Sequence, residues 1–410
     1  MSSEERFAAY LRATAATIVA GALLIVAFVV VVDPYRLYRI VDVAGVNREK
    51  PRPNRFQDEI KLANALAADA NAVILGNSRA ESGLDPDAPA WRERGLRAYN
   101  LAIAGTGITT AKRQLDYLIA HNHAPKMVLL GVEFLDFLVD PGSADNPPGP
   151  DVIHPSDAWR WRLETLLSLN SVGDALTTLY MQRYPDAETL TARGFNPLAQ
   201  YDSMARREGY YALFRQRAQE NARAYGQKPM RLGSDRSGDF DAFRAVLDAA
   251  ARHRIELVVV IYPYHAQLLA MLDQVGLSRA FAEWKARLVG IVDAARARDP
   301  RLQVVLWDYS GYGGPRCEPI PRPGDRTTVT RWYWEAGHFK SALGDRMLER
   351  MLAPTSDHQT ADGFGVVLTP DTLRYDAARL AAERAGCEVL DPALFAEAAE
   401  LTDAARPARR

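Results

Sequence analysis

The chain has 410 residues, of which 48% are hydrophobic and 25% charged, a composition typical of a globular protein with a sizeable core. Its 50 Lys and Arg residues nearly balance its 51 Asp and Glu residues, which leaves a formal net charge of -1. Because no basic excess is present to neutralise phosphates, this balance argues against a nucleic-acid-binding protein.

The first predicted element is a membrane-spanning helix over residues 13–32, which follows a short N-terminal tail (1–12). This stretch has no charged residue and is almost wholly apolar, and at about 1.5 Å per residue it spans about 30 Å, the thickness of a bilayer core. A cleaved signal peptide has a shorter apolar region that ends in small residues, whereas here the run continues into Asp33-Pro34. We therefore expect a retained signal anchor rather than a signal peptide or a buried core helix.

The charges beside the span favour one orientation. Arg and Lys residues are more numerous in the 25 residues after the span than in the tail before it, where two arginines are balanced by two glutamates. Taken alone, the positive-inside bias puts the main domain in the cytoplasm. Large domains can be translocated against such a bias, so the charges leave both orientations open.

A juxtamembrane linker (33–58) precedes a domain (59–352) in which apolar runs alternate with helical periodicity. The predicted strands lie at residues 72–76, 99–105, 127–132, 256–262 and 303–307. The predicted helices lie at residues 57–68, 109–119, 240–252, 281–298 and 341–352. This alternation predicts a doubly wound α/β domain whose parallel sheet is covered on both faces.

Two further segments depart from this alternation. Residues from about 140 to 235 begin with proline-rich turns and continue with helical pieces and scattered aromatics, so we interpret them as an aromatic-rich helical insertion. Residues 353–410 form a C-terminal extension with one strand-like run at 364–368 and two Ala-rich helices.

The two cysteines, Cys317 and Cys387, include no CxxC pair. The sequence therefore gives no support for a structural zinc or iron–sulfur site, and we expect neither a metal nor a cofactor. One disulfide in an oxidising compartment and two buried thiols are equally compatible with two cysteines.

Reactive side chains follow several of the predicted strands, and ligands of parallel sheets bind outside the carboxyl ends of the strands. The residues in such positions are Asn77, Ser78 and Arg79 after the first strand, Gly105 and Gly107 after the second, Glu133 and Asp136 after the third, and Tyr264 and His265 after the fourth. Taken alone, Ser78 is more typical of a helix cap. The Gly105-x-Gly107 pattern lacks the third glycine of a dinucleotide-binding loop and indicates such a site only weakly.

A second reactive pair lies near the end of the α/β domain. Glu335 precedes His338 by three residues, in a loop directly before the predicted helix at 341–352. A carboxylate in this position can orient the imidazole and leave the other ring nitrogen free to take a proton from a serine. The alternative is that His338 is a helix-entry residue bonded to backbone.

Three sequence blocks resemble those of the SGNH/GDSL hydrolase superfamily. The sequence at 76–79 (GNSR) resembles the first block, which carries the nucleophilic serine, and that at 99–105 (YNLAIAG) resembles the second, whose glycine donates a backbone N–H to the oxyanion. Glu335-x-x-His338 resembles the fifth block, normally D-x-x-H. Order and spacing agree across residues 71–352 without the insertion. The whole arrangement, with the sequences DPY at 33–35 and IYPYH at 261–265, is similar to the membrane-anchored branch associated with envelope polysaccharide O-acetylation and teichoic acid D-alanylation.

The resemblance implies a flavodoxin-like SGNH fold with Ser78, His338 and Glu335 as catalytic residues. It also implies an oxyanion site made by the backbone N–H groups of Ser78 and Gly105. Candidate substrate-binding residues are Asn77, Arg79, Glu133, Tyr264 and His265.

The resemblance further implies a single-pass protein of the cytoplasmic (inner) membrane with a periplasmic or otherwise extracytoplasmic main domain. That domain would act as an O-acetyltransferase or acyl esterase on a cell-envelope glycan such as an exopolysaccharide. A membrane-bound O-acyltransferase is a further candidate partner.

Two positions differ from the family pattern. The third block normally supplies an asparagine to the oxyanion hole, but here Glu133 occupies that position. Because an anion there would oppose a developing oxyanion, we expect Glu133 to turn away or to be bound by another group. Glu335 replaces the usual aspartate and keeps its charge. Loss of one oxyanion donor costs a factor of about a hundred or more in rate, so we expect slow or specialised activity.

The alternative function is a non-catalytic module that binds a glycan or a protein partner in an envelope acylation or polysaccharide export system. Aromatic rings of the insertion would serve it, because such rings stack on sugars. These residues are Trp159, Trp161, Tyr180, Tyr184, Tyr201, Tyr210 and Tyr211. For most of these rings a place in the core is the simpler expectation.

Overall fold

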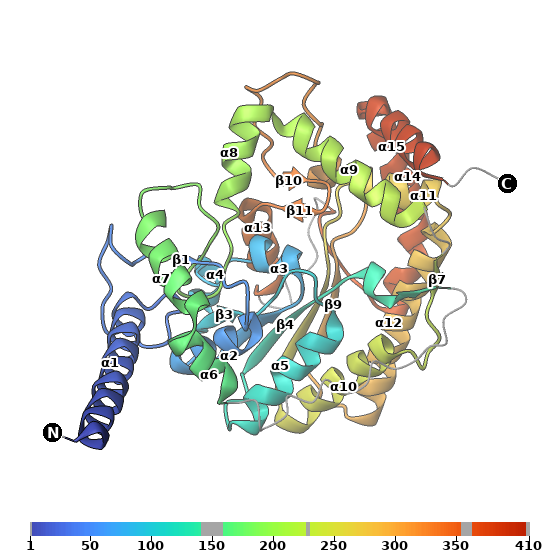
Figure 1. The fold of residues 1–410 in the computed structure, drawn as a ribbon. Helices are drawn as coiled ribbons and strands as arrows, with labels where there is room; N and C mark the ends of the chain where they lie inside the picture. Colours follow the sequence, from blue (N-terminus) through green and yellow to red (C-terminus); the bar gives the residue numbers. More distant parts are fainter. Residues whose placement is uncertain (1, 141–158, 227–229, 354–362, 407–410) are drawn as a thin grey trace.

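The computed structural model describes residues 2–140, 159–226, 230–353 and 363–406. Its centre is a six-stranded sheet in which five strands run parallel and the edge strand β12 runs antiparallel to β9 (Figure 1). In spatial order the strands are β12 (Val366–Val367), β9 (Val304–Asp308), β8 (Glu256–Ile261), β4 (Met127–Val132), β2 (Ala72–Leu75) and β3 (Ala98–Asn100). The prediction of an α/β fold built on a mostly parallel sheet is confirmed.

Both faces of the central strands are covered. Every residue of β2 and β4 is buried, which explains why these strands are continuous apolar runs rather than alternating ones. One group of helices that pack against one another is α5 (Ile108–Ala120), α10 (Gly238–His253) and α12 (Ser278–Arg298). A second group is α3 (Ser78–Gly83), α4 (Pro89–Glu93) and α13 (Ser341–Met351).

The predicted elements are present with shifted ends. The first predicted helix is α2 (Gln57–Ala67), and the predicted helix at 281–298 begins three residues earlier as α12. The strand predicted at 99–105 is shorter, because the ladder of β3 ends at Asn100 and the following residues form the turn beside Ser78. Sequence patterning missed α11 (Ala266–Gln274), which directly follows β8.

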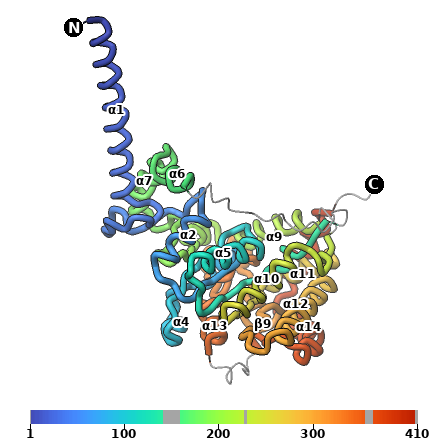
Figure 2. The backbone as a smooth tube through the Cα atoms, turned by 90° about the horizontal axis from the view of Figure 1, so that it is seen from below, coloured from blue at the N-terminus to red at the C-terminus, as the bar shows by residue number. Residues whose placement is uncertain are grey.

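The N-terminal helix α1 (Ser3–Val32) stands clear of the α/β domain (Figure 2). Of the helices in the described residues, it alone is long and apolar enough to cross a membrane. The residues that follow it, within the predicted linker, make buried hydrogen bonds. Asp33 is buried and accepts backbone N–H bonds from three residues at 37–39. The buried ammonium of Lys50 donates to the carbonyl of Val32 at 2.8 Å.

The predicted insertion contacts the end of α1 and the hairpin at residues 333–339. Its residues 141–158 lie outside the described residues. Its elements are α6 (Arg160–Leu167), α7 (Leu169–Met181), β6 (Thr189–Leu190), α8 (Ala199–Glu208), α9 (Tyr210–Gly226) and β7 (Arg231–Leu232). Helices α6 and α7 pack on α1, and β6 pairs with β1 (Lys50–Pro51) after the anchor. Helix α9 contacts β10 (Tyr333–Glu335), at the site described below, and β7 pairs with β5 (Leu138–Val139).

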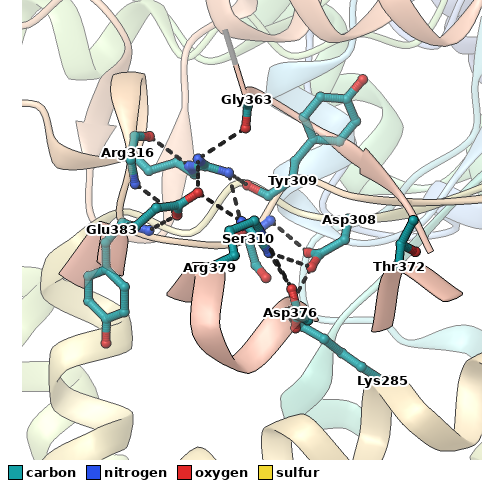
Figure 3. Close-up of polar contacts among 12 residues, drawn as sticks. Lys285, Asp308, Tyr309, Ser310, Arg316, Gly363, Thr372, Asp376, Arg379 and Glu383 are labelled. Atoms are coloured by element: carbon teal, nitrogen blue, oxygen red, sulfur yellow. Dashed lines mark hydrogen bonds and ion pairs between the residues drawn. The ribbon is translucent and has the colours of Figure 1, made fainter. Parts of the chain in front are cut away.

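The C-terminal extension is joined to the sheet by a buried network of charges (Figure 3). It contains the helices α14 (Pro370–Leu390) and α15 (Pro392–Ala405). The fully buried Lys285 donates to Asp308 at 2.7 Å and to Asp376 of α14 at 3.0 Å. Arg379 adds a bond to Asp308 at 3.2 Å. Burial opposes ionisation of Asp308, but the two cations outweigh it and lower the pKa of this carboxyl. The carboxyl end of β9 is therefore occupied by structural ion pairs.

A disulfide joins Cys317 to Cys387 and so links the loop after β9 to α14, with the two Cα atoms 5.8 Å apart. Of the two alternatives left open by the sequence, the structure shows the disulfide. Structural disulfides persist in oxidising compartments and are rare in the cytosol of mesophiles. The bond therefore suggests that the domain is extracytoplasmic.

We predict that replacing both cysteines with serine lowers the free energy of unfolding by about 4 kcal/mol. The bond closes a loop of 70 residues, and the chain-entropy model gives this value for such a loop. Thermal unfolding of the detergent-solubilised protein, with and without reductant, measures the change. Wild-type protein alkylated with a thiol-specific reagent during lysis should carry no label on either cysteine. Labelling of both cysteines without prior reduction would contradict the prediction.

Candidate active site

Ser78 lies on a tight turn between β2 and α3. Gly76 has a φ of +147°, and a Cβ at this position would lie 2.4 Å from Tyr262 Oη, so the turn requires glycine. Asn77 caps α3, because its Oδ1 accepts the N–H of Arg79 at 3.1 Å. The interpretation of Ser78 as the cap is therefore wrong, and its hydroxyl is free for other contacts.

His338 and Glu335 lie on a small hairpin of β10 and β11 (His338–Phe339). The Glu335 carboxylate is buried and accepts the backbone N–H of Gly337 at 2.6 Å through Oε2. Its Oε1 bonds His338 Nδ1. Because a carboxylate only accepts hydrogen bonds, Nδ1 carries the proton and Nε2 is left as an acceptor.

The structure brings Ser78 and His338 together from positions 260 residues apart. The Ser78 Oγ lies 2.8 Å from His338 Nε2. Both side chains are half-buried, so solvent reaches them, whereas Glu335 is only 1% exposed. Serine, histidine and carboxylate thus form one hydrogen-bonded line in the order that nucleophilic catalysis requires.

The surroundings of Glu335 favour the ionised form of its carboxyl group. Burial acts to raise its pKa, but the His338 imidazole, Arg217 and the Gly337 N–H together lower the pKa to about 2. Arg217 comes from α9 of the insertion, and its Nε lies 3.3 Å from Glu335 Oε1. The carboxylate is therefore ionised at every pH where the protein is expected to work.

The distance between Ser78 and His338 depends on a close approach of α3 to the hairpin and α13. A Cβ on Gly83, the last residue of α3, would lie 2.1 Å from the Phe339 ring. A Cβ on Gly344 of α13 would lie 1.6 Å from the carbonyl oxygen of Gly83. Glycine at both positions lets the two backbones meet, which brings the start of α3 to the histidine.

A buried ion pair also joins α3 to α2. Glu81 of α3 accepts a bond from Lys61 at 2.9 Å and one from Gln57 at 2.8 Å, and Arg52 lies 3.2 Å away. Asn100 at the end of β3 donates to the carbonyl of Ala80 at 2.8 Å. No local sequence pattern marks these supporting residues.

The backbone N–H groups of Ser78 and Gly105 are the oxyanion donors that the family resemblance implies. Neither has an acceptor among the described residues. The N–H of Ile103 donates to the carbonyl of Gly76 at 3.0 Å, which joins the Gly105 turn to the Ser78 turn. An oxyanion hole needs N–H groups that are not already bonded within the protein, and both groups meet that condition in the part of the chain that the structure describes.

Glu133, at the position where the resemblance predicts asparagine, has three side-chain partners among the residues that the structure describes. It is 3% exposed, forms an ion pair with Arg79, and accepts bonds from Tyr264 Oη at 2.9 Å and Asn77 Nδ2 at 3.4 Å. Arg79 also lies over the Tyr264 ring, 5.3 Å from its centre. This agrees with the expectation that Glu133 is bound by another group, and the cation of Arg79 offsets its charge beside the nucleophile.

Two of the candidate substrate-binding residues are fully buried beneath the site. Tyr264 uses its hydroxyl to bind Glu133 and the backbone N–H of Phe134. His265 caps α11 by accepting the Gln267 N–H, and its Nε2 lies 2.8 Å from the carbonyl of Glu318. Burial lowers the pKa of His265 to about 4, so the ring is neutral. Their assignment to substrate contact is corrected, because both residues are fully occupied in supporting the fold.

Asp136 lies at the edge of the Gly105–Gly107 turn. A Cβ on Gly107 would lie 3.0 Å from its Oδ2. Burial, assisted by the negative charges of Glu133 and Asp239, raises the pKa of Asp136 to about 8. Near neutral pH this side chain is therefore largely protonated and can donate a hydrogen bond.

A cluster of aromatic rings lies next to His338. The Tyr201 ring of α8 lies 6.4 Å from the His338 ring and 6.2 Å from that of Trp334. Tyr210 stacks on Trp334, and the Lys340 ammonium lies 4.5 Å from the Trp334 ring centre. The aromatics of the insertion thus divide into three groups. Trp161 and Tyr210 are core residues, Tyr201 and Tyr211 are half-buried, and Trp159, Tyr180 and Tyr184 are exposed.

No family model and no curated protein matches this chain. Within the described ranges, no group of three or more His, Cys, Asp or Glu side chains is placed to hold a metal ion. The interpretation of the site therefore depends on its own geometry.

We predict that Gly344→Ala slows the reaction of Ser78 with an active-site phosphonate by about 100-fold. The added Cβ must push α13 away from Gly83, and a displacement of about 1 Å in a reacting pair costs on this order. Gly290→Ala on α12 is the matched control, because a Cβ there meets nothing within 4 Å. A wild-type labelling rate in Gly344→Ala would show that the close approach does not position the pair.

We also predict that Glu133→Gln lowers the free energy of unfolding by about 3 kcal/mol, since it leaves the charge of Arg79, whose side chain is only 12% exposed, without its partner. Glu256→Gln is the control, because Glu256 pairs with Arg94 at 3.1 Å on the surface and such pairs contribute less than about 1 kcal/mol. Thermal unfolding of both variants measures the difference. Equal, small losses would mean that Arg79 readily finds solvent or another partner.

Proposed function

We propose that this protein is a membrane-anchored serine acyl-transfer enzyme of the SGNH type, an O-acetyltransferase or acyl esterase that acts on a cell-envelope polysaccharide. The observation that carries the proposal is the hydrogen-bonded line from Glu335 through His338 to Ser78. Asn77 rather than Ser78 caps α3, so the Ser78 hydroxyl can bond His338. Glu335 is ionised, as stabilisation of an imidazolium requires.

In the proposed first step, Ser78 Oγ attacks the carbonyl carbon of an acyl ester or thioester while His338 Nε2 takes the hydroxyl proton. The ionised Glu335 stabilises the imidazolium, and the N–H groups of Ser78 and Gly105 bind the oxyanion. The intermediate collapses, and the leaving group departs with the proton from His338. A sugar hydroxyl or water then attacks the acyl-serine, gives its proton to His338, and releases Ser78 with its proton restored.

The strand order supports the finer interpretation as a doubly wound, flavodoxin-like domain. From β2 the chain moves outward to β3 and then crosses back to β4, β8 and β9. Ser78 therefore follows the strand at which the direction of winding reverses, where ligands of open α/β sheets bind.

Three features support an envelope glycan as the acyl acceptor. The apolar helix α1 holds the domain at a membrane, and the disulfide favours an extracytoplasmic location for it. Tyr201 and Trp334 present half-buried rings next to His338, and such rings stack on sugars. A membrane-bound O-acyltransferase that delivers the acyl group is the protein partner we propose.

The second candidate is a non-catalytic glycan- or partner-binding module. It is favoured by Glu133, because the third-block position supplies no oxyanion donor and the Asn77 amide is turned toward this carboxylate. With only backbone donors, the site would be at least about a hundredfold slower than one with a side-chain donor. The reactivity of Ser78 distinguishes the two functions.

We predict that Ser78→Ala and His338→Ala each reduce acyl transfer by at least about a thousandfold, and that the double variant is no worse than either, because the pair acts as a unit. Glu335→Gln should be milder, since it keeps the hydrogen bond's shape but loses the charge. Phosphonate labelling and release of acetate from acetylated envelope polysaccharide are the measurements. If the wild-type protein labels no faster than Ser78→Ala, the binding module replaces the enzyme.

A further inference from the structure

Helices α6 and α7 expose apolar side chains on adjacent surfaces. On α7, Leu169, Leu176 and Tyr180 are spaced seven and four residues apart, so they form one stripe along the helix. Leu169 is 88% exposed and Leu176 is 56% exposed. On α6, exposed Leu163 and Leu167 form a second stripe, which Trp159 extends at the start of the helix. These six residues are called the α6–α7 apolar face.

Helix α7 also lacks exposed charge. Asp174 is its one charged residue. It is half-buried and accepts a bond from Tyr35 Oη at 2.5 Å. A surface helix of a soluble domain ordinarily carries charged side chains opposite its buried face. Monomeric soluble proteins also rarely expose contiguous apolar patches of more than a few hundred Å². Helix α7 is therefore unlike a water-facing helix, whereas α6 carries the exposed Arg160 and Arg162 beside its leucines.

A neighbouring face of the same helices packs against the end of α1. Val29 and Val32 of α1 form a buried cluster with Ala175, and Phe28 packs on the same cluster. Leu166, Val172 and Leu179 complete it from α6 and α7. Figure 2 shows the two helices beside α1, on the side of the domain from which α1 projects.

The depth of this contact follows from the length of the span. About 20 apolar residues cross the hydrocarbon core, and here the uncharged run is 13–32. Its last residues, 28–32, therefore lie at the outer boundary of that core, and α6 and α7 lie at the same level. The exposed Val43 and Val46 lie close by, because Asn47 donates to the carbonyl of Val32 at 3.2 Å.

From this placement we infer that the α6–α7 apolar face lies in the headgroup and outer acyl region of the bilayer that α1 spans. Its composition fits that environment, since Trp and Tyr favour the membrane interface and Leu enters the acyl boundary. Together with α1, the face gives the domain a second membrane contact and so fixes its tilt. The inference depends on α1 crossing a membrane and not on the chemistry of Ser78.

The test uses the full chain in nanodiscs of phosphatidylcholine and phosphatidylglycerol. Both native cysteines are in the disulfide, so a single introduced thiol can carry an environment-sensitive dye. Leu169→Cys and Leu176→Cys report on the face. Tyr375→Cys is the matched control, because Tyr375 is 72% exposed on α14, which lies away from α1 in Figure 2.

We expect the dye on both leucine positions to shift to the blue on reconstitution, to be quenched by spin-labelled lipid, and to lose accessibility to iodide. The Tyr375→Cys dye should do none of these. Equal iodide access at all three positions would place the face in water and overturn the inference. Protection in native membrane vesicles but not in nanodiscs would mean that a protein covers the face, which also overturns it. Phosphonate labelling of Ser78 in each variant separates this result from the proposed chemistry.

Discussion

The site depends on one steric constraint, the backbone contact between Gly83 of α3 and Gly344 of α13. A Cβ at Gly344 would lie 1.6 Å from the Gly83 carbonyl oxygen, so any side chain there separates the two helices. Ser78 begins α3, and His338 lies three residues before α13. The contact thus sets the distance between two groups that are 260 residues apart. Close-packed interiors transmit such displacements instead of absorbing them.

Two ion pairs, one on α3 and one on the turn before it, hold Ser78 in position. Lys61 and Glu81 hold α3 onto α2, and Arg79 and Glu133 join the nucleophile turn to the end of β4. Such pairs add little net stability when compared with apolar residues, but a single unpaired member is costly. Their geometric effect is to allow one position of α3. Arg79 also offsets the charge of the Glu133 carboxylate next to the turn that carries Ser78.

Much of the fold and the meeting of Ser78, His338 and Glu335 could be predicted from the sequence, because they depend on local patterns. Continuous apolar runs marked the parallel strands, and the short spacing of Glu335 and His338 marked a carboxylate–imidazole pair. Arg217, Lys61 and the Arg79–Glu133 pair could not be predicted in the same way. Their partners come from distant segments, and no periodicity records which charges meet. His265 was misassigned because a strand-end position indicates an edge of the sheet, not whether the side chain reaches its surface.

Long-range contacts that the sequence does not record also occur in the predicted linker after α1, which makes buried hydrogen bonds to the end of that helix. Flexible linkers let a tethered domain sample a volume that grows with their length. Here the end of α1 is instead bonded to Lys50, and β1 pairs with β6 of the insertion. Helix α1 is therefore joined to the domain by direct hydrogen bonds. In the membrane-anchored enzyme proposed above, this junction would hold Ser78 at a set height above the bilayer. Such a tether confines the proposed reaction to acyl groups and glycans presented at that height, so delivery at the membrane surface, rather than diffusion of the domain, determines which substrates meet the serine.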